Sequence, residues 1–167
     1  MLHFKECLRR VAEASAMTIY DIEPVIQDTA LHMLKAVDGA MGEFHIPLRL
    51  IILRPRAIWK YSANNWMDYN QLLVYVLAHE FRHAQQHKSN TLPMPDPHRY
   101  YKDGIIDQDK WKIDPGEKDA LDYAEDVTKH MSGITMLDIS EFLIHEWRGY
   151  NLYEDPLLFK CDLPATL

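Results

Sequence analysis

The feature that most constrains the fold is a continuous apolar run that leads directly into a polar motif. Residues 72–78 read LLVYVLA, and residues 79–83 follow them as HEFRH. A helix that is apolar on nearly all sides is stable only where the rest of the fold surrounds it. We therefore predict a buried helix over about residues 69–88, begun by Asp68 and Gln71, which have the spacing of a capping box.

Length and composition indicate one globular domain over residues 1–167. Apolar residues make up 47% of the chain and charged residues 26%, an ordinary balance for a folded protein. The net charge of -7, from 25 acidic and 18 basic residues, argues against nucleic acid or an anionic membrane surface as the main partner. None of these quantities indicates an oligomeric state.

Cysteine usage and the ends of the chain point to a reducing compartment. Cys7 and Cys161 lie far apart in the sequence, which excludes a disulfide framework and a thiolate zinc site. Residues 1–17 are charged and lack the apolar core of a secretory signal, and no apolar run is long enough to span a membrane. We expect a soluble, cytoplasmic protein.

The remaining elements predict an α+β fold that is mainly helical. Apolar residues recur at helical spacing over about residues 4–16, 23–38, 116–131 and 139–152. Residues 47–55, rich in isoleucine and leucine between two prolines, predict a strand, and residues 57–62 are its predicted partner. The proline-rich connection over residues 89–114 is long enough to indicate a functional segment.

The histidine pair of the HEFRH motif predicts a metal site. Residues four apart on a helix share a face, so His79 and His83 would direct two imidazoles at one point, where zinc binds nitrogen at about 2.0–2.1 Å. Glu80 points elsewhere around the helix, and its carboxylate is placed to act as general base on a metal-bound water. His87 lies one turn further, about 6 Å along the axis, and is excluded as a ligand.

A third ligand is predicted from the helix over residues 116–131. Glu117 lies close to the buried face of that helix, which makes it the favoured ligand, and Asp119, further round, is the second choice. Three further acidic side chains face solvent in this helical pattern: Asp122, Glu125 and Asp126. A catalytic zinc has three protein ligands and one open position, which the pair of histidines and one carboxylate would satisfy.

The motif HEFRH, followed by EKDALDYA at residues 117–124, resembles the gluzincin-type zinc metallopeptidases, and in particular the short, single-domain forms of bacteria and their phages. In that family the second motif reads E-x-x-A-D/N-x-x-A. The resemblance implies a zincin-like fold with an HExxH active-site helix, ligands His79, His83 and Glu117, and Glu80 as general base. Leu121 departs from the pattern, because the family often has a polar partner for a ligand histidine at that position; Asp119 or Asp122 could replace it.

The expected activity is hydrolysis of peptide bonds in a peptide or protein substrate. Zinc would activate a water, and Glu80 would carry its proton to the leaving amine. Candidates for stabilising the oxyanion are His98, Tyr100, Tyr101, Tyr123, His130 and His145.

Two matters stay open at the level of sequence. An extended substrate would pair with a sheet edge, and residues 48–53 and 57–62 are the candidate edges; the aromatic side chains of Trp59, Tyr61 and Trp66 either line a subsite or, by preference, pack in the core. The alternative function is a zinc-binding regulatory or partner-binding protein with a metallopeptidase-like fold and no general proteolytic activity. Imidazole and carboxylate ligands also accept other divalent ions.

Overall fold

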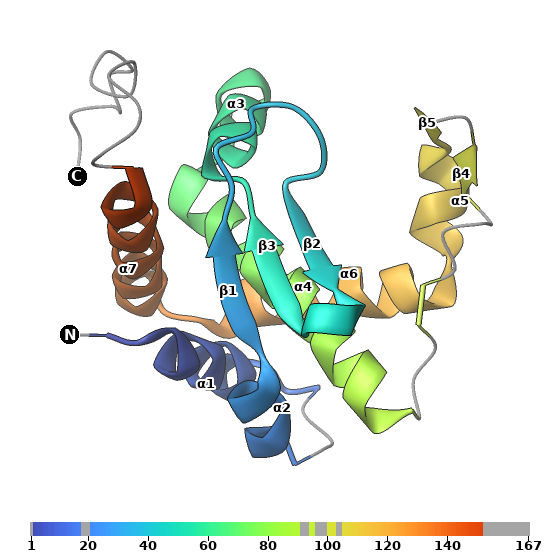
Figure 1. The fold of residues 1–167 in the computed structure, drawn as a ribbon, viewed down its shortest axis with the longest axis horizontal. Helices are drawn as coiled ribbons and strands as arrows, with labels where there is room; N and C mark the ends of the chain where they lie inside the picture. Colours follow the sequence, from blue (N-terminus) through green and yellow to red (C-terminus); the bar gives the residue numbers. More distant parts are fainter. Residues whose placement is uncertain (1, 18–20, 91–93, 96–99, 103–104, 152–167) are drawn as a thin grey trace.

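The computed structural model describes residues 2–17, 21–90, 94–95, 100–102 and 105–151, with the backbone alone at 101–102 and 149–151. Its helices are α1 (Phe4–Ala14), α2 (Glu23–Asp28), α3 (Pro55–Asn65), α4 (Tyr69–Ser89), α5 (Gln108–Ile113), α6 (Pro115–His130) and α7 (Gly133–Asn151), with a 3-10 turn, η1 (Ile46–Leu48). Its strands are β1 (Ala30–Met33), β2 (Gly42–His45), β3 (Leu50–Leu53), β4 (Tyr101–Lys102) and β5 (Ile105–Ile106). The mainly helical α+β class is confirmed (Figure 1).

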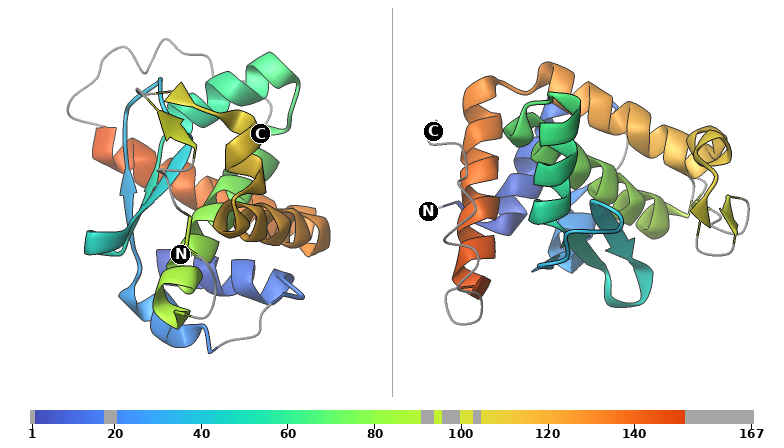
Figure 2. Two further views of the ribbon diagram at one scale, coloured as in Figure 1. Left: turned by 90° about the vertical axis from the view of Figure 1, so that its right-hand side faces the viewer. Right: turned by 90° about the horizontal axis from the view of Figure 1, so that it is seen from above.

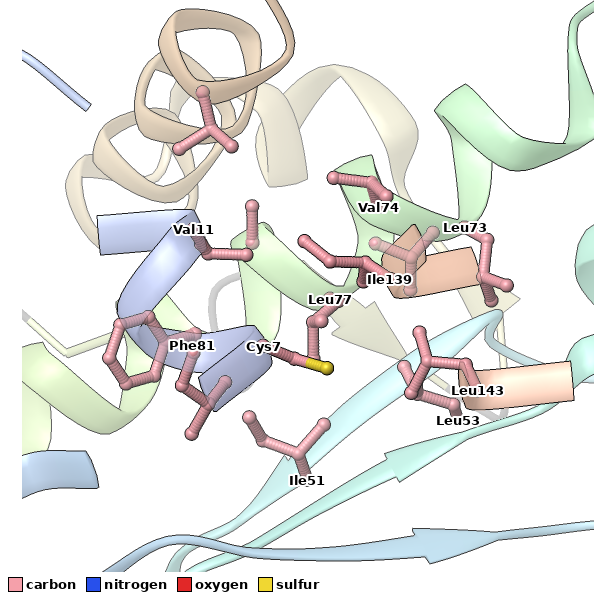
Figure 3. Packing of buried hydrophobic residues seen from close by; sticks show 14 of the residues in the cluster. Cys7, Val11, Ile51, Leu53, Leu73, Val74, Leu77, Phe81, Ile139 and Leu143 are labelled. Carbon is pink, nitrogen blue, oxygen red and sulfur yellow. The ribbon is translucent and has the colours of Figure 1, made fainter. Parts of the chain in front are cut away.

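Helix α4 is the centre of the fold. It lies between α6 and the three-stranded sheet, as the right-hand view of Figure 2 shows, and it also contacts α1, α3 and α7. Leu73, Leu77 and Phe81 of α4 are fully buried, in contact with a core that includes Cys7 of α1 and Ile51 of β3 (Figure 3). The predicted buried helix is therefore confirmed, and five helices and two strands of the sheet pack against it: α1, α2, α3, α6, α7, β2 and β3.

The ends of α4 are set by local signals. Asp68 accepts a hydrogen bond from the backbone N–H of Gln71 at 2.7 Å, as an N-cap does, and Asn90 closes the helix in the left-handed conformation at φ 53°. The capping role expected for Asp68 is confirmed, and the observed helix extends one residue beyond the predicted end.

The small sheet has the order β1-β3-β2, so β3 is central. β1 runs parallel to β3, with Ala30 opposite Leu50, and β2 runs antiparallel to it, with Gly42 opposite Leu53. The strand predicted over residues 47–55 is confirmed at its centre. The predicted pairing of residues 57–62 with it is wrong, because both sides of β3 are already paired and Pro55 occupies the first position of α3, where proline favours a helix.

The helix predicted over residues 23–38 is also wrong beyond Asp28. Thr29 is extended, and the ammonium of Lys5 donates to the carbonyls of Ile26, Gln27 and Thr29, which the continuing helix would otherwise use. Residues 30–33 then form β1, since their backbone groups pair with β3. Long-range pairing thus overrides a helical apolar pattern.

The other predicted helices are found with shifted ends. The first ends at Ala14, two residues early; α6 matches residues 116–131 within one residue at each end; and α7 begins at Gly133, six residues before its expected start. The connection over residues 89–114 contains β4, β5 and α5. Cys161 and residue 152 of the last predicted helix lie outside the described residues. Within the described part of the chain, no helix has the length and apolar character needed to cross a membrane.

The central position of α4 makes a direct prediction about stability. Leu77→Ala removes a fully buried side chain and should lower the free energy of unfolding by about 2–5 kcal/mol in a urea titration. Leu48→Ala is the matched control, because Leu48 is 66% exposed and its change should stay within about 0.5 kcal/mol. Equal effects of the two substitutions would contradict this arrangement of the core.

Candidate metal centre

Three potential metal ligands converge between α4 and α6. Nε2 of His79 and Nε2 of His83 are 3.0 Å apart, and Oε2 of Glu117 lies 3.2 Å from the first and 3.4 Å from the second. The three side chains form the one group of potential ligands found among the described residues, and all three residues are buried. The structure thus brings together the three residues that the sequence predicts as ligands.

These separations suit a tetrahedral zinc ion. In a regular tetrahedron with bonds of about 2.0–2.1 Å, neighbouring ligand atoms are about 3.3 Å apart. The distances of 3.0, 3.2 and 3.4 Å are close to that value. The donor set of two imidazoles and one carboxylate is also one that catalytic zinc uses.

The site also contains buried polar atoms that lack hydrogen bonds. Among the described residues, neither Oε2 of Glu117 nor Nδ1 of His79 has a hydrogen-bond partner. A buried polar group without a partner is unfavourable by kilocalories, and a carboxylate more so. A cation held by Oε2 of Glu117 and the two Nε2 atoms would satisfy the carboxylate, so the residues present fit a divalent metal.

Hydrogen bonds hold both the backbone and the side chain of Glu117. Asp114, the N-cap of α6, accepts hydrogen bonds from the backbone N–H groups of Gly116 and Glu117 at 2.9 and 3.3 Å. The hydroxyl of Tyr100 donates to Oε1 of Glu117 at 3.0 Å. The second oxygen, Oε2, is thereby left to face the histidines.

Electrostatics keep Glu117 charged. Burial acts to raise the pKa of Glu117, but the imidazoles of His79 and His83 outweigh it and hold this pKa below its ordinary value. A ligand carboxylate must be ionised to bind a metal. Glu117 is therefore in the ligating form at neutral pH.

Glu80 lies beside the ligands without joining them. It is also buried, and burial raises the pKa of its carboxyl above the ordinary value, against the opposing effect of His79 and His83. A raised pKa makes a carboxylate a better proton acceptor, as a general base requires.

Strand β2 passes so close to Glu80 that only glycine fits at one position. A Cβ atom on Gly42 would lie 2.8 Å from Oε1 of Glu80 and 2.6 Å from Cγ1 of Val76. Real Cβ atoms do not approach other atoms this closely. The backbone of β2 therefore forms one wall beside the Glu80 carboxylate.

Asp119, the second choice for the third ligand, has a different position. Its carboxylate accepts from Nε of Arg82 at 2.8 Å and from Nε2 of Gln86 at 2.9 Å, and Gln86 in turn contacts Nδ1 of His83. Asp119 reaches the histidine only through Gln86.

The other acidic residues of α6 lie away from the site. Asp122 pairs with Lys118, and Glu125 is exposed, in agreement with the solvated positions expected for them. Asp126 has a structural role that was not expected, because it accepts from Ser15 Oγ at 3.0 Å and from the backbone N–H of Ala16 at 2.7 Å and so ties α6 to α1. His87 contacts the ring of Phe44, outside the ligand cluster.

Of the six candidates for oxyanion stabilisation, the structure brings Tyr100 to the site. Tyr123 is buried beside Arg82 and accepts from Nε2 of Gln85 at 3.2 Å, as a core residue. His130 pairs with Asp126, and His145 is exposed on α7. His98 and the side chain of Tyr101 lie outside the described residues.

Two residues of the site were missed by sequence reasoning. Gln86 lies three residues after His83. This spacing places two side chains side by side on a helix, so the sequence does indicate a contact between them. Gly42 has no such signal, because its close approach to Glu80 joins a strand to a helix distant in sequence.

Comparisons with protein-family models, with curated proteins and with solved structures found no match to this chain.

The ligand set predicts metal content. Protein dialysed against micromolar zinc should retain about one ion per chain by elemental analysis, and Glu117→Gln should lose it, because a neutral amide is a poor ligand. Glu125→Gln is the matched control on the same helix and should retain the metal. Zinc retained equally by both variants would remove Glu117 from the ligand set.

The contact between β2 and Glu80 predicts a packing effect at Gly42. Gly42→Ala should lower the free energy of unfolding by about 1–3 kcal/mol in urea, because the added methyl group overlaps Val76 and Glu80. Gly133→Ala has no atom within 4 Å of the new methyl group and should change stability by less than about 0.5 kcal/mol. A Gly42→Ala protein as stable as the native chain would disprove the close approach.

Proposed function

We propose that the protein is a zinc-dependent metallopeptidase with a zincin-like fold. The observation that carries this proposal is the convergence of His79, His83 and Glu117, with the Glu80 carboxylate on the same helix beside them. A zinc ion bound there supplies an acidified water and polarises the scissile carbonyl. A glutamate adjacent to the ligands, with its pKa raised by burial, is the residue that such chemistry requires and that a purely structural zinc site does not.

Glu80 and Tyr100 have separate roles in this proposal. Glu80 accepts a proton from the attacking water and delivers it to the leaving amine. The Tyr100 hydroxyl donates its one hydrogen to Oε1 of Glu117, and it is the candidate at the ligands among the described side chains. To stabilise the oxygen that gains negative charge, it would turn that hydrogen from Glu117 to this oxygen.

The proposed substrate is an extended peptide that adds to the edge strand β2. Both sheet edges predicted from the sequence are wrong. Residues 48–53 include β3, which is the central strand, and residues 57–62 belong to the helix α3. β2 is an edge of the sheet, and its Gly42 lies against Glu80. A peptide paired with β2 would therefore run past the proposed base.

The aromatic residues considered for a subsite are exposed. Trp66 is 97% exposed, and Trp59 and Tyr61 are also exposed on α3. The preference for core packing is therefore wrong for these three side chains. Trp59 and Tyr61 lie on the outer face of α3, and Trp66 follows its last residue.

A zinc-binding regulatory or partner-binding protein is the second candidate function. One observation favours it: His79, Glu80, His83 and Glu117 are only 6–8% exposed. A closed site suits an ion that joins α4 to α6 and meets no substrate. The two functions differ in whether Glu80 is needed for a reaction.

Glu80→Gln separates the two functions. For the metallopeptidase, this variant should keep its zinc but cleave a randomised peptide mixture about 10²–10⁴-fold more slowly than the native chain, measured by mass spectrometry of new termini. Glu141→Gln, an exposed change on α7, is the control and should cleave at the native rate. Zinc-loaded native protein that cleaves neither this mixture nor unfolded proteins would instead support the binding function.

A further inference from the structure

We propose that Gln86 is a positioning residue that fixes His83 as a metal ligand through Nε2. The inference rests on the proposed metal site and adds a residue to it. Gln86 is fully buried on α4, and its side-chain oxygen lies 2.7 Å from Nδ1 of His83.

The hydrogen bonds around Gln86 determine which end of its amide faces the histidine. Its nitrogen, Nε2, lies 2.8 Å from the carbonyl oxygen of Gly116 and 2.9 Å from Oδ2 of Asp119. Both of those atoms only accept, so the end of the amide that faces them must be the NH₂ group. The other end, Oε1, therefore faces His83.

The orientation of Gln86 then determines the tautomer of His83. Oε1 of an amide can only accept a hydrogen bond, so Nδ1 of His83 must carry the proton that it receives. In the neutral imidazole the proton on Nδ1 leaves a lone pair on Nε2. Nε2 is the atom that faces Glu117 and His79, so Gln86 presents His83 in the form that binds a metal.

Gln86 is itself anchored from the neighbouring helix. Asp119, which accepts from it, is held by Nε and Nη2 of Arg82 at 2.8 and 3.3 Å, and Arg82 is 1% exposed. A bidentate pair of this kind, with its guanidinium buried, has little freedom to rotate. The chain of contacts thus runs from Arg82 through Asp119 and Gln86 to the ring of His83.

The two ligand histidines differ in this respect. Nδ1 of His79 has no hydrogen-bond partner among the described residues, whereas Nδ1 of His83 contacts Gln86. The contacts thus fix the tautomer of His83 but not that of His79. Outer hydrogen-bond partners of this type change metal affinity by about 10–100-fold.

The test compares two adjacent buried glutamines. Gln86→Met keeps the volume of the side chain but removes the acceptor, and it should weaken zinc binding about 10–100-fold in competition with a chelating dye. Gln85→Met is the matched control. Gln85 is also buried, at 2% exposure, and bonds to Arg82 and Tyr123 but does not touch a ligand, so the zinc affinity of this variant should stay within about threefold of native. Equal affinities for Gln86→Met and the native chain would overturn the proposal.

A second measurement needs no variant to fold. In the native protein labelled with ¹⁵N at histidine, NMR should show a proton bound to Nδ1 of His83, with zinc and without it. A proton on Nε2 instead would overturn the proposal. If the native chain binds no zinc, the proposed function fails, while the proton on His83 still decides the role of Gln86.

Discussion

The burial of the polar half of α4 is the constraint on which the rest of the structure depends. The helix enters the core as an apolar segment and continues, still buried, through His79, Glu80, Arg82, His83 and Gln86. Each of these side chains needs a partner inside the protein. Helix α6 supplies Glu117 and Asp119 for this purpose, which explains why the packing of α4 against α6 is the most extensive contact in the fold.

The partners fall into two kinds. Arg82 and Asp119 form an ion pair with Gln85 and Tyr123 around them, and Gln86 links this pair to His83. The half that contains His79, His83 and Glu117 has three electron-rich atoms directed at one point. An ion bound at that point would join the two helices, and its affinity and the stability of the fold would then be linked.

The sequence is sufficient to predict α4, its cap and its ligands, because apolar periodicity, Asp68 and the spacing of His79 and His83 are local signals. Glu117 could be found too, since it belongs to the buried face of an amphipathic helix. The strand β1 could not, because its apolar residues fit a helical pattern and only pairing with β3 decides otherwise. The contacts of Gly42 and of Asp119 depend on how separate elements meet, which no local pattern records.

The close approach of β2 to Glu80 has a consequence for how the sheet forms. Sliding β2 by one residue along β3 would bring Met41 or Glu43 opposite Leu53, where Gly42 lies now. Either residue would place a Cβ atom within 3 Å of Val76 and Glu80. Short strands usually rely on alternating burial to choose their register. Here the helix that carries the metal ligands disfavours the slipped pairings sterically, so one close contact both aligns the strand and leaves room for the Glu80 carboxylate.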